Sequence, residues 1–173
     1  MAVLRYSVVC GLWMLGSVVH AAVDAPRSHA YAFDQPELLA TQRVFGVGNA
    51  VTLLGEACIE DAKAADSYAE WGERNQATLS DMTVVLAAHY RIFEPSGDLQ
   101  QRVAEAMHLN TKLTLSNSAL TEACASLPAT LAQPTMDLAQ RYQSILREVS
   151  DPNYTNPRKQ KKNNDREDQT SSQ

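Results

Sequence analysis

The sequence lacks the short motifs that most directly reveal an activity. It contains no Gly-x-Ser-x-Gly of a serine hydrolase, no Cys-x-x-Cys of a redox or haem-attachment site, and no Gly-x-Gly-x-x-Gly of a dinucleotide fold. Members of a catalytic triad need not be close in sequence, so these absences do not exclude catalysis. They favour a protein that is not an enzyme and holds no cofactor.

Positive charge is scarce in the body of the chain. Residues 23–157 contain 9 Lys and Arg against 17 Asp and Glu, a formal charge of −8, whereas residues 158–173 contain 5 against 3. A surface for nucleic acid needs cations that displace counterions from phosphates. We therefore expect no nucleic-acid partner, and the acidic body suits a basic protein partner.

No apolar run reaches the roughly 20 residues that a transmembrane helix needs. The longest run lies between Arg5 and His20, and it is preceded by one basic residue and followed by small residues. This is the order of a secretory signal peptide, and Val19 and Ala21 fit the −3 and −1 positions of its cleavage site. We predict cleavage after Ala21 and a periplasmic or secreted product without a transmembrane segment. A retained anchor or an N-terminal helix of the mature domain is the alternative.

Proline is absent from residues 37–93, and apolar residues recur there at helical spacing. One helix over about 58 residues would be about 87 Å long, more than a domain of this size accommodates. A break is therefore predicted between residues 44 and 78. The segment Trp71–Asn75, which contains Gly72, is the first choice and Gly46–Asn49 is the second. The two apolar stripes are Val44, Val47, Val51, Leu54 and Cys58, and Leu79, Met82, Leu86, His89 and Phe93.

The rest of the chain predicts further short helices. Turn residues at 94–98 precede apolar stripes at 99–107, 120–131 and 138–149, and Asp98 and Pro134 are expected helix starts. The sequence thus predicts an all-α fold, a compact bundle of four to five helices. Its expected organisation is a signal peptide at 1–21, an extended arm at 22–34, a helical domain at 35–152 and a disordered, polar and basic tail at 153–173.

Cysteine is rare, and only Cys58 and Cys124 remain after the predicted cleavage. Each lies on the apolar stripe of a different predicted helix. In an oxidising compartment such a pair is expected to form a disulfide, and unpaired core thiols are the alternative. Closing so long a loop would stabilise the fold by about 4 kcal/mol in the chain-entropy model.

An acidic run with interspersed aromatic residues follows Cys58. Aromatic residues and arginine dominate binding hot spots in protein interfaces. Tyr68, Trp71 and Arg74, with the nearby carboxylates of Glu70 and Glu73, are therefore the predicted contact for another extracytoplasmic protein. An adaptor, an inhibitor or a protective partner would each fit this description. The alternative interpretation is that Trp71 covers the core at a helix end.

A second functional hypothesis uses the scattered histidines and methionines. Imidazole and thioether groups suit copper, so His89, His108, Met82 and Met107 could form a periplasmic metal or small-ligand site in the bundle. Glu105 and His108 have the Glu-x-x-His spacing of di-iron bundles, but the second copy is missing. The main prediction therefore contains no metal.

Overall fold

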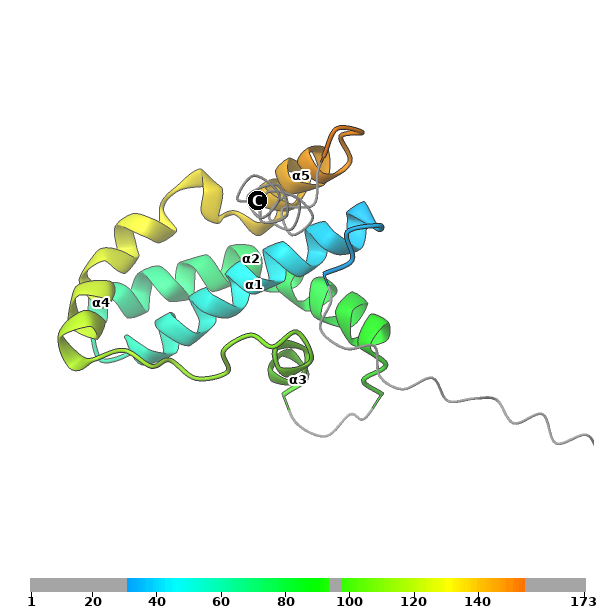
Figure 1. Cartoon of the computed structure of the whole chain (residues 1–173). Coiled ribbons are helices and arrows are strands. Elements are labelled where there is room, and N and C mark those ends of the chain that lie inside the picture. Colours follow the sequence, from blue (N-terminus) through cyan, green and yellow to red (C-terminus); the bar gives the residue numbers. More distant parts are fainter. Residues whose placement is uncertain (1–30, 94–97, 155–173) are drawn as a thin grey trace, which may run out of the picture.

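The computed structural model describes residues 31–93 and 98–154, which form an all-α fold without strands (Figure 1). The described elements are α1 (Pro36–Ala57), α2 (Ala62–Tyr90), α3 (Leu99–Ala106), α4 (Asn117–Leu131), the short 3-10 helix η1 (Pro134–Met136) and α5 (Leu138–Val149). This confirms the predicted helical bundle, with five α-helices. None of the helices in these two ranges is long and apolar enough to cross a membrane. The predicted signal peptide and the tail beyond residue 154 lie outside the described residues.

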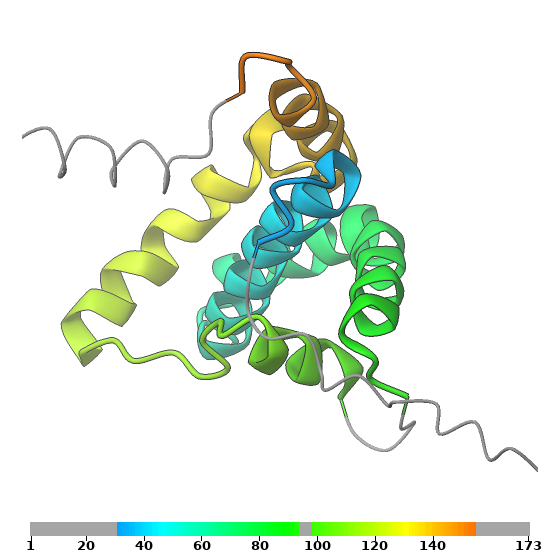
Figure 2. The ribbon, with the colours of Figure 1, turned by 45° about the vertical axis from the view of Figure 1, so that its right-hand side comes forward.

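A long hairpin of α1 and α2 forms the centre of the molecule (Figures 1 and 2). α5 packs against α1, while α3 and α4 pack mainly against α2. α2 bends near its middle, so that its C-terminal half leads away from α1 (Figures 1 and 2). In that half the Thr83 hydroxyl donates to the Leu79 carbonyl at 2.7 Å, a type of bond that often bends helices.

The break between α1 and α2 falls at residues 58–61, so both predicted positions were wrong. Asp61 caps α2, because its side chain accepts a hydrogen bond from the Ala64 amide at 3.0 Å. The Asp61 amide donates to the Cys58 carbonyl at 3.0 Å and closes the turn. Gly72 lies inside α2 instead, where an added β-carbon would meet no atom within 4 Å. The turn contains neither glycine nor proline, and a capping carboxylate begins the next helix.

The other helix ends agree with the sequence in part. Asp98 caps α3 as predicted, and its carboxylate accepts from the amides of the first turn. Pro134 begins η1 rather than the last helix, and Asp137 caps α5. Pro128 lies inside α4 without ending that helix.

The core contains most of the predicted stripe residues but not Phe93, which is 79% exposed. α2 ends at Tyr90, and Arg91 follows in the left-handed region with φ of 58°. Phe93 therefore no longer lies on the helical stripe that predicted its burial. The buried stripe residues include Val44, Val51, Leu79, Met82, Leu86, Val103, Leu127, Leu131, Leu138 and Val149.

The disulfide between Cys58 and Cys124 is confirmed, with the two α-carbons 5.4 Å apart. Cys58 is the C-terminal cap of α1, and Cys124 lies within α4. Both cysteines are buried. The bond therefore fastens α4 to the turn of the central hairpin.

Buried amide side chains hold the connecting segments onto the hairpin. Gln42 accepts from the Ala32 amide at 2.8 Å and donates to the Tyr90 hydroxyl at 2.7 Å. Asn49 donates to the Asn110 carbonyl at 2.9 Å. A buried polar group needs a hydrogen-bond partner. Gln42 therefore fixes the position of the segment before α1, and Asn49 fixes that of the connection after α3.

Candidate functional site

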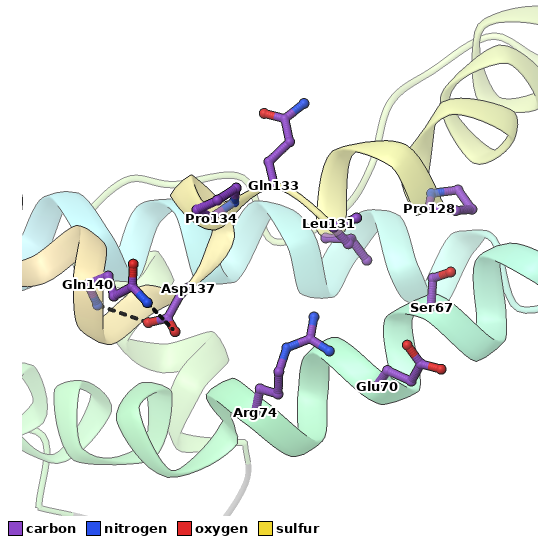
Figure 3. Close-up of a pocket in the computed structure, with 10 residues that line it drawn as sticks. Ser67, Glu70, Arg74, Pro128, Leu131, Gln133, Pro134, Asp137 and Gln140 are labelled. Atoms are coloured by element: carbon purple, nitrogen blue, oxygen red, sulfur yellow. Dashed lines mark hydrogen bonds between the residues drawn. The ribbon is translucent and has the colours of Figure 1, made fainter.

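The candidate site is an open groove between α2 and the segment that joins α4 to α5, with a volume of about 460 Å³ (Figure 3). It is called the α2–α4 groove below. Ser67, Glu70 and Arg74 line it from α2. On the opposite side lie Leu131, Asp137 and Gln140.

The α2 wall of this groove carries two of the predicted contact residues, Glu70 and Arg74, together with Ser67. Ser67, Glu70 and Arg74 follow one another at spacings of three and four, so they share one face of the helix. Figure 3 shows Arg74 extending from α2 toward the segment between α4 and η1. Arg74 is exposed and makes no ion pair with any described residue.

The opposite wall contributes a fixed carboxylate. Asp137 accepts from the Gln140 amide at 2.9 Å and from the Gln140 side chain at 3.4 Å (Figure 3). Capping of α5 holds this carboxylate in place. Asp137 was not among the predicted contact residues, although its three-residue separation from Gln140 is a capping signal.

Trp71 lies beneath the groove and not on its surface. The indole is 2% exposed, and its Nε1 donates to the Met136 carbonyl at 2.8 Å. Asn75, one turn further along α2, donates to the Trp71 carbonyl and accepts from the Leu138 amide at 2.7 Å. These bonds fasten η1 and the start of α5 to α2. Trp71 is thus a core residue, as the alternative interpretation held, but it lies within α2 and not at a helix end. It offers no exposed surface to a partner.

Tyr68 belongs to the packing of the hairpin. Its ring stacks on Trp71, with centroids 6.2 Å apart, and its carbon atoms occupy the space where a β-carbon at Gly55 would lie. Burial raises the pKa of the Tyr68 phenol above 10.0, a hydrogen bond with Thr52 opposes the rise, and the charge of Glu56 adds to it. A phenol in this setting stays protonated at neutral pH.

The five predicted contact residues are therefore divided among four environments. Glu70 and Arg74 line the groove, and Glu73 is exposed beside them in the sequence. Tyr68 is half-buried and Trp71 is buried.

The surface around the α2 side of the groove is strongly acidic. Its exposed carboxylates belong to the end of α1, the turn and the first half of α2, where Lys63 and Arg74 are the only described cations. Such a field favours the approach of a basic partner. The carboxylates are those of Glu56, Glu60, Asp61, Asp66, Glu70 and Glu73.

The alternative ligand residues occupy dissimilar positions. Met82 and Met107 are buried in the core, whereas His108 is exposed just beyond α3 in a left-handed conformation with φ of 53°. His89 is half-buried, and its ring meets the Tyr90 ring edge-on at 4.8 Å. Within residues 31–93 and 98–154, no group of three or more His, Cys, Asp or Glu side chains is placed to hold a metal ion.

Comparison with known proteins adds no relative: no family model, curated protein or solved structure matches the chain. The groove supplies the anchored carboxylate of Asp137 and the exposed side chains of Glu70 and Arg74.

Proposed function

We propose that the chain is an exported, non-enzymatic interaction protein that binds a basic segment of another extracytoplasmic protein in the α2–α4 groove. The observation that carries the proposal is the placement of carboxylates on both walls, Glu70 on α2 and Asp137 at the start of α5 (Figure 3). A lysine or arginine inserted between the walls would meet negative charge on either side. An adaptor, an inhibitor or a protective partner of an exported protein would use such a site.

The groove also contains one feature that would orient the partner. Arg74 lies among the carboxylates and makes no ion pair with a described residue. A partner that carries one acidic group between two basic residues would place the acidic group at Arg74 and the basic residues at Glu70 and Asp137. A partner with one basic residue between two acidic groups would meet like charges and be rejected. Charge complementarity of this kind contributes more to specificity and association rate than to affinity.

Two observations support export. The disulfide between Cys58 and Cys124 is of a kind that forms and persists in oxidising compartments. The first 21 residues have the order of a signal peptide, and the predicted product is periplasmic or secreted. Sequencing the N-terminus of the protein recovered from the extracytoplasmic fraction tests export and the cleavage position, and thiol labelling of the same sample with and without reductant tests the disulfide.

The proposal is tested by capturing partners with the tagged mature protein from that fraction and measuring the affinity of the purified pair. Glu70→Arg reverses one charge in the groove, and Asp81→Arg makes the same change at an exposed position further along α2. We expect Glu70→Arg to weaken binding by tenfold or more and added salt to weaken the wild-type complex. Equal effects of the two variants, or binding that is insensitive to salt, would contradict the proposal. Metal analysis of the same preparation tests the alternative metal-binding function.

The buried position of Trp71 gives an independent test of the groove. After the predicted cleavage Trp71 is the only tryptophan, since Trp13 lies in the signal segment. We expect its fluorescence to resist added quencher. Trp71→Phe keeps a ring in the core but removes the bond to Met136, so it should weaken partner binding although it lies below the contact surface. An unchanged affinity would show that this wall needs no anchoring from Trp71.

A further inference from the structure

A second groove, here called the η1–α5 groove, lies between η1 and α5 and has a volume of about 590 Å³. It shares Pro134 and Gln140 with the α2–α4 groove, so the two form one continuous surface. Its charge is opposite, because among the described residues Arg141 and Arg147 are the charged ones that line it. Two arginines in one groove of an otherwise acidic protein favour the binding of an anionic group.

Both guanidinium groups are anchored by main-chain carbonyls. Arg141 donates from Nη1 to the Thr135 carbonyl at 3.0 Å, and Arg147 donates from Nε to the Gln143 carbonyl at 3.3 Å. Neither arginine makes an ion pair within the described ranges. The Nε atom of Arg141 is also buried without a hydrogen-bond acceptor. Positively charged donors that lack an anionic partner gain most from a carboxylate.

The polar groups of the groove extend along one face of α5. Gln140, Gln143, Ser144 and Arg147 recur at helical spacing over about two turns, or about 10 Å. Ile145 supplies an apolar surface beside them. A row of amides and hydroxyls matches the repeated main-chain groups of an extended peptide. A single anionic headgroup would use only one end of that row.

We infer that the η1–α5 groove binds an acidic peptide segment, with carboxylates at Arg141 and Arg147 and an apolar side chain against Ile145. This inference rests on the proposed interaction function and specifies its partner. Because the two grooves adjoin at Pro134 and Gln140, the partner carries its acidic segment directly next to the basic one.

The experiment is a selection of short displayed peptides on the full mature chain, followed by affinity measurement of the selected peptides. We expect peptides with Asp or Glu beside an apolar residue. Arg147→Gln should weaken their binding about fivefold, and Arg147→Lys, which keeps the charge but loses the planar fork, by less. Lys112→Gln, the same loss of charge at an exposed loop position, should leave the affinity within about twofold of wild type. Selected peptides without carboxylates, or equal effects of Arg147→Gln and Lys112→Gln, would overturn the inference.

Two further variants separate the possible causes of failure. Glu70→Gln reports on the α2–α4 groove when it is measured on the captured partner and not on the short peptides. Loss of partner affinity in Glu70→Gln but not in Arg147→Gln would refute the acidic segment alone, and loss in Arg147→Gln but not in Glu70→Gln would refute the proposed function. The chain's own tail also contains Asp165, Glu167 and Asp168. If replacing these three with their amides tightens peptide binding tenfold or more, the tail is the occupant and a partner segment is not.

Discussion

The two ends of the α1–α2 hairpin are held by different chemistry. At the disulfide end, Cys58 is covalently bonded to Cys124 of α4, and Gly55 of α1 contacts the Tyr68 ring of α2. At the other end, called the polar end, no covalent bond joins the described elements, and the buried Gln42 bridges the arm and the end of α2. The first end is secured against the loss of any single weak contact. The second depends on each buried polar group keeping its partner.

The polar end also has an outer layer. Arg43 pairs with Glu148 of α5 at 3.2 Å, hydrogen-bonds to the Tyr154 hydroxyl and lies over the Tyr154 ring. Burial raises the pKa of the Tyr90 phenol beneath it, the hydrogen bond from Gln42 opposes the rise, and Tyr31 adds to it. One domain therefore has one end held by a disulfide and one end held by polar contacts. Substitutions at the two ends can compare how much each contributes to the free energy of unfolding.

Removal of the disulfide should have the largest effect on stability. The double variant Cys58→Ser/Cys124→Ser loses the constraint that the bond places on the unfolded chain, and we expect a loss of about 4 kcal/mol in the free energy of unfolding. Urea unfolding with and without reductant measures it. Reductant should lower the stability of the wild type and leave the double variant unchanged. Equal stability of the oxidised and reduced wild type would show that the bond contributes nothing.

Gln42→Met should have the next largest effect, because it keeps the length of the side chain but removes both hydrogen bonds. The Ala32 amide and the Tyr90 hydroxyl then lose their partners inside the protein, and we expect a loss of about 2–3 kcal/mol. A double-mutant cycle with Tyr90→Phe is the control. The combined loss should be smaller than the sum of the single losses, since one bond is shared. Strict additivity would mean that the bond between Gln42 and Tyr90 does not contribute.

The same substitution should have opposite signs at two glycines. A β-carbon at Gly55 would lie 2.6 Å from Cε2 of Tyr68, so Gly55→Ala should destabilise the disulfide end by about 1–2 kcal/mol. Gly72 faces open space inside α2, and Gly72→Ala should stabilise the fold by about 0.5–1 kcal/mol through helix propensity. Thermal unfolding of both variants gives the signs. A gain at Gly55 would mean that the two helices are less tightly packed than described.

Glu148→Gln should have the smallest effect. The ion pair with Arg43 joins side chains that are 27% and 59% exposed, so its loss should cost about 0.5 kcal/mol. The difference between variant and wild type should shrink as salt is added, because exposed charges are screened. Unfolding at low and high ionic strength measures both quantities. An effect above that of Gln42→Met would show that the outer layer, and not the buried amide, contributes most to the stability of the polar end.

Much of the fold was predictable because its signals are local or periodic. The stripes through Val44 and Leu86 showed which faces are buried, and the placement of Cys58 and Cys124 on such stripes predicted the disulfide. The helix break was missed because Asp61 sits within an acidic run, where a capping carboxylate is hard to distinguish from an exposed one. The predicted break at Gly72 was wrong because tertiary packing tolerates a glycine within a long helix.

The candidate site was predictable only along α2. Glu70 and Arg74 are close in sequence, whereas Asp137 reaches the same groove through tertiary structure, since Trp71 and Asn75 fix η1 and the start of α5 to α2. The partners of the buried amides lie far away in the chain, and no periodic pattern marks such pairs. The burial of Trp71 depends likewise on a distant carbonyl.

The bond between Asn49 and Asn110 bears on how the protein can be engineered. It fixes the start of the connection between α3 and α4, and the cap at Ser116 fixes its end. Residues between these two points can change in length without disturbing either anchor, and doubling a flexible loop costs only about 0.6 kcal/mol. Thr114 and Leu115 are exposed and lie in neither groove. This loop is accordingly the place to insert an epitope or a fluorophore while both grooves stay open.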